Sequence, residues 1–263
     1  MRSKAELADL PAALRQIAER AGVAILDVYE GRVALDARQK ADQSPVTAAD
    51  DAAEAVILAA LHDLTPDIPV VSEEAAEAGN IPDVSGGRFW LVDPLDGTKE
   101  FLSRNGEFTV NIALIEDGFP TAGVVHAPAL KKTWLGAGTD TACYAEADQP
   151  PVPIRTRPQP ATGAVVTASR RHGDAAAMDD FLADIKVDTR VDAGSSLKFC
   201  LVASGDADLY PRFGRTMEWD TAAGHAVLLA AGGRVERADD GTPLTYGKAG
   251  FENPYFIARG CRP

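Results

Sequence analysis

The stretch that decides the fold is Trp90-Leu91-Val92-Asp93-Pro94-Leu95-Asp96-Gly97-Thr98-Lys99-Glu100-Phe101. The apolar run over residues 89–92 is short, aromatic and β-branched, and turn residues follow it, so it predicts a buried strand. The proline and glycine that come next predict a tight change of direction, which brings Asp93 and Asp96 close together. Two carboxylates at one turn repel each other unless they are protonated or bridged by cations. The stretch therefore predicts a cation held at a strand end.

The same stretch also predicts an anion site. Gly97 lets the backbone approach a ligand, and Thr98 stands where a helix or turn begins. Free amide groups at such a start bind anions. Carboxylates would thus hold a divalent metal while amides hold a phosphate. A plain turn capped by its own carboxylates is the structural alternative.

The remainder of the first half predicts helices packed against a meandering sheet. Thr47 is expected to cap the second helix, with Asp50 three residues on, and Pro66 to stop it. The alternation over residues 108–114 predicts a strand with one buried face. We expect helices over residues 7–22 or beyond and 47–65, an irregular arm over 31–45, and further strands over 68–71, 121–126 and 133–138.

The segment 149–160 contains five prolines and few large apolar residues, which is typical of a linker or an edge segment. We place a domain boundary there, with an α+β domain over residues 1–150 and an α/β domain over 151–263. The second half alternates strands and helices, so the fold class is α/β. Its expected strands cover 164–168, 187–191, 207–210 and 255–258, and its helices cover 174–185, 195–203 and 220–231.

Composition excludes several classes of protein. The 263 residues are 46% hydrophobic, with no apolar run near the roughly 20 residues of a membrane span. The net charge of −13 argues against binding nucleic acid or an anionic membrane. The three cysteines are far apart and have no metal-ligand spacing, which indicates a reducing compartment, and we expect a cytoplasmic protein. Loose peripheral contact with a membrane stays open.

Acidic residues stand at four separate element ends. Each alone has an ordinary structural role, such as a helix-start charge, a solvated glutamate or an N-cap. Together they form the oxygen-rich donor set that a hard cation requires. Two such ions activate water and neutralise the leaving oxygen in phosphoryl transfer. The residues are Asp50, Glu73, the pair Asp93 and Asp96, and Asp220.

Four segments, in this order along the chain, resemble the inositol monophosphatase superfamily: Thr47-Ala48-Ala49-Asp50, Ser72-Glu73-Glu74, Asp93-Pro94-Leu95-Asp96-Gly97-Thr98 and Trp219-Asp220-Thr221-Ala222-Ala223-Gly224. The similarity spans nearly all of residues 40–260. It implies a layered α/β/α/β/α sugar-phosphatase fold and a Mg²⁺-dependent, Li⁺-sensitive phosphomonoesterase.

The resemblance also implies the ligands of the metals. One Mg²⁺ would be held by Glu73, Asp93 and the carbonyl of Leu95. Asp93 would bridge to a second ion, which Asp96 and Asp220 complete. A third, weaker ion beside Glu73 would bring the number to two or three.

Catalytic roles follow from the same resemblance. Asp50 and Thr98 match the pair that orients and deprotonates the attacking water. The amides of Gly97 and Thr98 match the phosphate cradle. Water would attack phosphorus in line, without a covalent phosphoenzyme.

Further segments resemble the bacterial 3'(2'),5'-bisphosphate nucleotidases within that superfamily: Lys99-Glu100-Phe101, Gly194-Ser195-Ser196-Leu197-Lys198-Phe199, Leu209-Tyr210-Pro211-Arg212-Phe213-Gly214 and Thr216-Met217-Glu218-Trp219-Asp220. They imply hydrolysis of the 3'-phosphate of adenosine 3',5'-bisphosphate (PAP), and of its sulfated analogue PAPS, in sulfate assimilation. The partner is then a small nucleotide, and the protein is a monomer or a homodimer.

A second phosphate on the substrate needs an additional cationic contact, which Lys198 at a helix start would provide. Ser195 and Ser196 would donate hydrogen bonds to the same phosphate, and His172 would stack on the base. The structural alternatives are a solvated helix lysine and a surface turn histidine.

Two other functions compete with this interpretation. The first keeps the chemistry and changes the substrate to an inositol, histidinol or sugar phosphate. The second is a non-catalytic, metal-dependent nucleotide sensor. A pure binder has no use for a water-activating pair such as Asp50 and Thr98.

Overall fold

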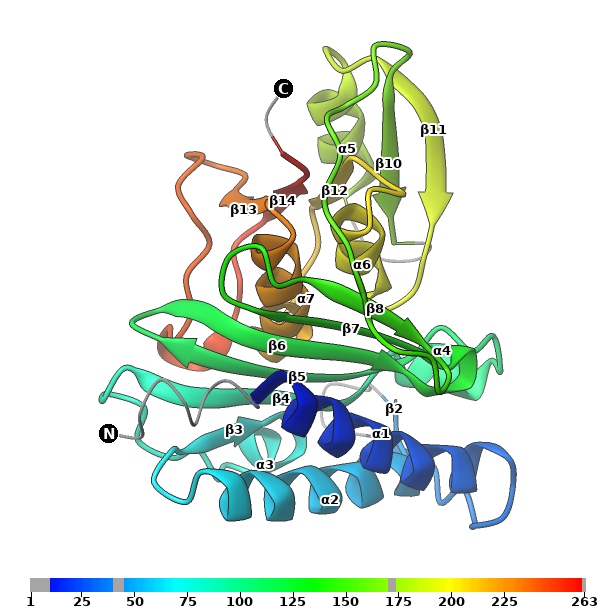
Figure 1. Ribbon diagram of the computed structural model, residues 1–263, viewed down its shortest axis with the longest axis vertical. Helices are drawn as coiled ribbons and strands as arrows, with labels where there is room; N and C mark the ends of the chain where they lie inside the picture. Colours follow the sequence, from blue (N-terminus) through cyan, green and yellow to red (C-terminus); the bar gives the residue numbers. More distant parts are fainter. Residues whose placement is uncertain (1–9, 40–44, 170–173, 262–263) are drawn as a thin grey trace.

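A seven-stranded sheet forms the middle of the computed structural model, which describes residues 10–39, 45–169 and 174–261. Its strands, in spatial order, are β3 (Val70–Ser72), β4 (Arg88–Asp96), β5 (Thr109–Glu116), β6 (Phe119–Ala127), β7 (Lys132–Ala137), β8 (Cys143–Glu146) and β9 (Val152–Pro153). The β3–β4 pair is parallel and the other pairs are antiparallel (Figure 1).

Two helices, α1 (Leu10–Tyr29) and α2 (Ala48–Leu64), cover one face of this sheet (Figure 1). Thr47 caps α2 as predicted, and its side chain and that of Asp50 form a reciprocal capping box. Helix α1 continues past Gly22, since this glycine serves close packing and does not stop the helix. A Cβ there would lie 2.7 Å from Nε2 of His126 on β6.

Two more helices, α6 (Leu197–Ala203) and α7 (Trp219–Ala230), cover the opposite face. Helix α7 lies directly on β6 and β7, where glycines allow a close approach. A Cβ on Gly123 would lie 2.8 Å from Cβ of Ala226, and one on Gly136 would lie 2.7 Å from Cβ of Ala230. Strand β5 is thus buried on both faces, so the prediction that residues 108–114 bury one face only is wrong.

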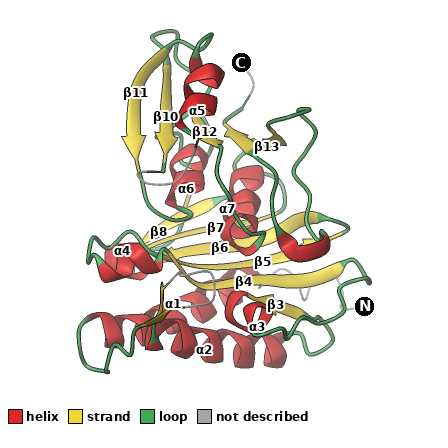
Figure 2. Ribbon diagram, turned by 180° about the vertical axis from the view of Figure 1, so that it is seen from behind, coloured by secondary structure: helices red, strands yellow, loops and turns green. Residues whose placement is uncertain are grey.

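A second sheet lies beyond α6 and α7 (Figures 1 and 2). Its strands, in spatial order, are β11 (Val187–Asp192), β10 (Ala164–Ala168), β12 (Leu209–Arg212), β14 (Phe256–Arg259) and β13 (Arg234–Arg237). Helix α5 (Ala175–Leu182) packs on its outer face. The layers follow in the order α/β/α/β/α, which confirms the expected fold class. The domain division at residue 150 stays a prediction.

The sequence pattern missed several short elements. These are the paired strands β1 (Arg38–Gln39) and β2 (Pro45–Val46) in the arm, the strands β8 and β13, the helices α3 (Glu73–Glu77) and α4 (Thr98–Leu102), and two 3₁₀ turns (Pro128–Leu130 and Ala249–Phe251). Strand β4 also runs on to Asp96, with an irregular register between Asp93 and Asp96 where a tight change of direction was expected. No helix among the described residues is long and apolar enough to cross a membrane.

Candidate active site

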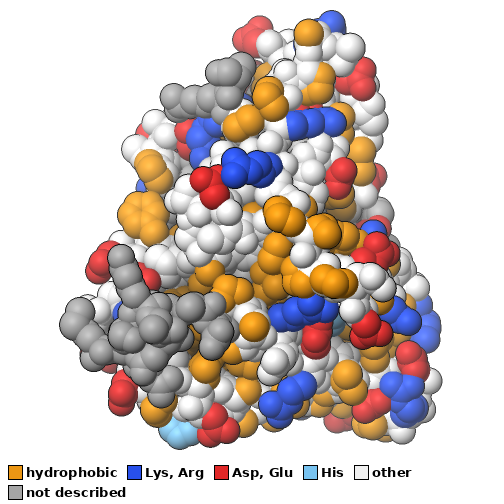
Figure 3. All heavy atoms as spheres, in the orientation of Figure 1, with side chains coloured by type: hydrophobic (Ala, Val, Ile, Leu, Met, Phe, Trp, Pro, Cys, Tyr) orange, Lys and Arg blue, Asp and Glu red, His pale blue; other side chains and the backbone are white. Residues whose placement is uncertain are grey.

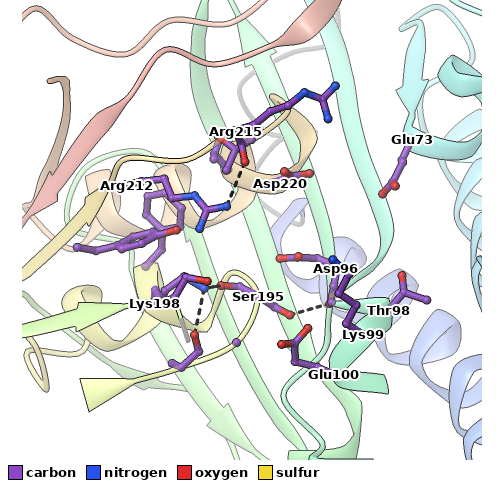
Figure 4. A pocket seen from close by; sticks show the side chains of 18 of the residues that line it. Glu73, Asp96, Thr98, Lys99, Glu100, Ser195, Lys198, Arg212, Arg215 and Asp220 are labelled. Atoms are coloured by element: carbon purple, nitrogen blue, oxygen red, sulfur yellow. Dashed lines mark hydrogen bonds between the residues drawn. The ribbon is translucent and has the colours of Figure 1, made fainter. Parts of the chain in front are cut away.

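The ends of several elements meet around a pocket of about 280 Å³ (Figure 4). Strand β4 ends there with Asp96 and α4 begins with Thr98, while Asp220 lies in the first turn of α7. Arg212 comes from the end of β12 in the small sheet, and Lys198 comes from α6, which lies between the two sheets. The large sheet and the small sheet therefore both contribute to this site.

The half-buried Asp96 and Asp220 line the pocket, and the buried Asp93 lies close enough for its charge to interact with theirs. Burial raises the pKa of Asp93 well above its usual range, and the charges of Glu73, Asp96 and Asp220 raise it further. Burial and the neighbouring Asp96 and Glu73 likewise raise the pKa of Asp220. The pKa of Asp96 is raised by burial, although Lys198 partly offsets this effect. Such mutual repulsion disappears when a cation binds between the carboxylates.

These donors fit Mg²⁺ by their chemistry, because all of them are oxygens and most are anionic. Among the residues described, no three or more His, Cys, Asp or Glu side chains are arranged as a finished site for one ion. The fit therefore rests on the donor types and their repulsion. The predicted ligand sets, with Glu73, Asp93, Leu95, Asp96 and Asp220, stay predictions.

Each acidic residue is held in place by its surroundings. The Leu95 amide donates to Oδ1 of Asp93 at 3.1 Å, and the Met217 amide donates to Oδ2 of Asp220 at 2.9 Å. Glu54 on α2 accepts hydrogen bonds from the Ser72 hydroxyl and the Ala75 amide. It thereby fixes the start of α3, where Glu73 stands.

Asp50 and Thr98, which the family resemblance pairs, lie close together, and their catalytic roles stay predictions. Oδ2 of the buried Asp50 accepts from the Thr47 amide at 2.7 Å and from the Thr47 hydroxyl at 2.8 Å. Its other oxygen, Oδ1, accepts from the Thr98 hydroxyl at 3.4 Å. The capping box thus orients the carboxylate that faces Thr98.

Gly97 is required by both conformation and space. Its φ of +91° lies in the left-handed region, and a Cβ there would collide with the Ser195 hydroxyl. The chain turns at this glycine from β4 into α4. The predicted amide cradle for phosphate at Gly97 and Thr98 stays a prediction.

The two serines that follow Gly194 bond to protein carbonyls. The Ser195 hydroxyl lies 2.8 Å from the carbonyl oxygens of both Asp96 and Glu107. The Ser196 hydroxyl donates to the Asp220 carbonyl at 2.8 Å. In this arrangement they connect the small sheet's α6 segment to the acidic strand end and to α7. Their predicted hydrogen bonds to a phosphate stay predictions.

Lys198 is not a solvated helix residue, since only 4% of it is exposed. Its Nζ donates to the carbonyls of Ala193 at 3.2 Å and Ser195 at 2.5 Å, and lies 5.3 Å from the centre of the Tyr210 ring. Burial lowers the pKa of Lys198 to about 8, although Asp96 works in the opposite direction. His172, predicted to stack on the base, lies outside the described residues.

Sequence patterns gave no role to Arg212 or Arg215, which also line the pocket. Arg212 donates from Nη2 to the Arg215 carbonyl at 3.0 Å, and Nε of Arg215 lies 3.3 Å from Glu252. Figure 4 shows Lys198 and Arg212 on one side of the pocket and Glu73 and Thr98 on the other. Arg212 stood in a quoted motif, but its position at a strand end gave no separate signal.

The layered fold and the buried carboxylates define a class of protein. A sequence profile of the inositol monophosphatase family matches residues 6–255, and the chain belongs to this family. The chain is 48% identical over 241 residues to the 3'(2'),5'-bisphosphate nucleotidase CysQ of Salmonella typhimurium, covering 92% of this chain and 96% of that protein. The identity is also 48%, over 242 residues and with the same coverage, for CysQ of Escherichia coli strain K12.

Solved structures give the same assignment. CysQ from Bacteroides thetaiotaomicron superposes with a TM-score of 0.78 at 35% identity, covering 97% of this chain and 98% of that one. An inositol monophosphatase from Anabaena has a TM-score of 0.77 at 24% identity, covering 97% and 92% of the two chains, which shows the shared fold.

Proposed function

We propose that the chain is a Mg²⁺-dependent 3'(2'),5'-bisphosphate nucleotidase, which hydrolyses the 3'-phosphate of PAP to give AMP and phosphate. The proposal rests first on the division of the pocket into an acidic side and a basic side. Its relatives named as CysQ nucleotidases, which match over almost their whole length, support the same substrate. The reaction would clear a by-product of sulfate assimilation, with PAPS as a second substrate.

The basic side of the pocket accounts for the second phosphate. The whole chain carries a net charge of −13, so a polyanionic substrate meets a repulsive field on average. On the face drawn in Figure 3, the described Lys and Arg side chains are interspersed with Asp and Glu and form no extended basic area. Within the pocket, however, Lys198 and Arg212 lie together on one side (Figure 4). They would bind the 5'-phosphate that an inositol monophosphate lacks.

The acidic side would hold the metal. The family is metal-dependent, in general through Mg²⁺. Glu73, Asp93, the Leu95 carbonyl, Asp96 and Asp220 would hold two or three ions. When bound, Mg²⁺ supplies charge neutralisation at the leaving oxygen and lowers the pKa of a water.

Asp50 and Thr98 would handle the proton of the attacking water. The Thr98 hydroxyl lies 3.4 Å from both Asp50 Oδ1 and the Leu95 carbonyl, so it donates toward acceptors and keeps its lone pairs for a water proton. Asp50 receives the proton at Oδ1, while Thr47 occupies Oδ2. The side chain is thereby fixed before substrate arrives.

The enzyme is placed in the cytoplasm by this proposal. Cys143, Cys200 and Cys261 are all free thiols in the structure, which suits a reducing compartment. Whether the enzyme works as a monomer or a homodimer stays a prediction.

The decisive experiment measures phosphate release from PAP, 5'-AMP and inositol 1-phosphate, each with Mg²⁺ and with EDTA. Fast, Mg²⁺-dependent release from PAP alone is expected, because 5'-AMP lacks the 3'-phosphate and inositol 1-phosphate lacks the second one. Preferential hydrolysis of inositol phosphate would overturn the nucleotidase assignment and keep the metal site. Tight PAP binding without release would favour the nucleotide sensor.

A further inference from the structure

A buried asparagine lies at the junction between the two parts of the acidic cluster. Asn111 is on β5, opposite Asp93 in the register with β4, and is fully buried. Its neighbours along the strand, Val110 and Ile112, are apolar and equally buried. An unbonded amide in such a position is costly, so its hydrogen bonds account for its presence there.

The hydrogen bonds of Asn111 fix the orientation of its side-chain amide. The Thr109 hydroxyl donates to Oδ1 of Asn111 at 3.0 Å. The amide nitrogen Nδ2 then donates to Oδ2 of Asp96 at 3.2 Å and to the Ser196 hydroxyl oxygen at 3.0 Å. The opposite orientation of the amide would place its oxygen against the Asp96 carboxylate, which cannot donate when ionised.

Ser196 extends this chain of hydrogen bonds to Asp220 on α7. Because its oxygen accepts from Asn111, its single proton is available for the Asp220 carbonyl, 2.8 Å away. Asp96 stands at the end of a strand of the large sheet, whereas Asp220 stands at the start of α7. Asn111 is thus bonded directly to one carboxylate residue and through a single hydroxyl to the other.

We propose that Asn111 is a positioning residue that sets the placement of Asp96 relative to Asp220, and so the affinity of the metal that they share. This inference rests on the proposed function, because it takes both aspartates as metal ligands. Partners behind metal ligands typically change metal affinity by about 10-fold to 100-fold when they are removed. We expect a loss in that range for Asn111→Leu, which keeps the volume and removes all three hydrogen bonds.

The test uses Mn²⁺ as a probe and the full chain without substrate. Electron paramagnetic resonance of free Mn²⁺ gives the dissociation constant of the wild type, Asn111→Leu and a matched control, Thr133→Val. Thr133 is also buried in the large sheet, on β7, where its hydroxyl lies 2.9 Å from Nδ1 of His126. Circular dichroism compares the folding of all three proteins.

The expected result is weaker Mn²⁺ binding by Asn111→Leu and unchanged binding by Thr133→Val. In PAP hydrolysis the Mg²⁺ concentration for half-maximal activity should rise in parallel, while saturating Mg²⁺ restores much of kcat. A merely structural role would lower the melting temperature without moving the metal dependence.

Two outcomes separate this inference from the proposed function. Unchanged Mn²⁺ affinity in a folded Asn111→Leu, with wild-type PAP hydrolysis intact, overturns the inference alone. If the wild type does not hydrolyse PAP but Asn111→Leu still binds Mn²⁺ more weakly than the wild type, the inference is supported and the proposed function is removed.

If Asn111→Leu does not fold, Ser196→Ala tests the same chain of hydrogen bonds. Unchanged Mn²⁺ affinity in Ser196→Ala then overturns the inference. Where both single variants fold, the double variant Asn111→Leu/Ser196→Ala should lose less Mn²⁺ affinity than the two single variants together, because both changes interrupt the same chain of hydrogen bonds.

Discussion

The Thr98 hydroxyl lies 3.4 Å from Oδ1 of Asp50, although 48 residues separate the two in the chain. Each residue stands at the start of a helix that meets the large sheet, Asp50 on α2 and Thr98 on α4. Asp50 keeps this oxygen for Thr98 because Thr47 binds the other one. The reactive pair is therefore assembled by two helix starts and a capping box.

The first prediction concerns this pair. Thr98→Val keeps the shape of the side chain and removes the hydroxyl, so kcat for PAP should fall by about 10²–10⁴, the usual range for lost proton transfer. Asp50→Asn should cause a loss of the same order while still capping α2. Steady-state phosphate release at saturating Mg²⁺ measures both.

A matched control lies next to Asp50 on the same helix turn. Asp51 is exposed and pairs with Arg38 at the surface, so Asp51→Asn should leave kcat unchanged. Near-normal kcat in Thr98→Val would remove this residue from the catalytic machinery.

The second prediction concerns metal and stability. Binding of Mg²⁺ at 100 times its Kd should stabilise the protein by about 2.7 kcal/mol by mass action. For a chain of this size that corresponds to a rise in Tm of about 5–10 °C. EDTA should abolish this rise together with the activity, and added Mg²⁺ should restore both.

Asp96→Asn should not destabilise the metal-free protein, although it should weaken the stabilisation by Mg²⁺. Burial raises the pKa of Asp96, so its charge opposes folding of the metal-free protein. The variant should therefore melt no lower than the wild type in EDTA, gain less from Mg²⁺ and lose most turnover. A normal Mg²⁺ response would contradict the assignment of Asp96 as a ligand.

The third prediction concerns the second phosphate. Arg212→Ala should lower kcat/KM for PAP more than for 3'-AMP, which has the reacting phosphate but no 5'-phosphate. A lost charge-assisted hydrogen bond costs about 1.5–3 kcal/mol, which corresponds to about 10-fold to 100-fold in kcat/KM. Lys198→Ala should show the same selectivity. Equal losses on the two substrates would exclude either residue as a contact to that phosphate.

The fourth prediction concerns the packing of α7 on the large sheet. Gly123→Ala places a methyl group 2.8 Å from Cβ of Ala226 and 2.9 Å from the Ala223 carbonyl, so the helix must move. Overpacking of this kind costs about 1–3 kcal/mol. Because α7 carries Asp220, the Mg²⁺ requirement should rise as well. Gly86→Ala, where a Cβ meets nothing within 4 Å, is the control and should be neutral in both measurements.

The fifth prediction concerns acid stability. Burial lowers the pKa of His126 from 6.5 to about 4 in the folded protein. The unfolded chain takes up this proton more readily, so His126 favours the folded state above pH 6.5, and this contribution is lost as the pH falls toward 4. Between about pH 7 and pH 4.5 the wild type should lose about 2 kcal/mol more than His126→Gln, as measured by urea unfolding. Equal losses of stability in the wild type and in His126→Gln would contradict this role of His126.

Much of the fold was predictable because apolar periodicity and caps act locally. Thr47 and Pro66 delimited α2, and the proline-rich segment marked the edge of the large sheet. The buried outer face of β5 was not predictable, because α7 covers it from more than a hundred residues away. Gly123 and Gly136, which allow this contact, carry no local signal for a partner helix.

The residues of the site were likewise predictable in part. The acidic motifs and the family resemblance pointed to Glu73, Asp96 and Asp220, which the fold does bring to one pocket. The hydrogen bonds that Ser196 and Asn111 make within the protein could not be predicted, since their partners depend on how two sheets approach each other. Arg212 was missed for the same reason.

The core shared by the two sheets also limits how far they can move relative to each other. Phe89 and Ile115 of the large sheet, α6 and α7, and Phe256 of the small sheet belong to one continuous apolar cluster. Swinging the sheets apart would expose that core to water, so the described parts of the two sheets should move as one body. Heating should therefore melt both sheets in a single cooperative step.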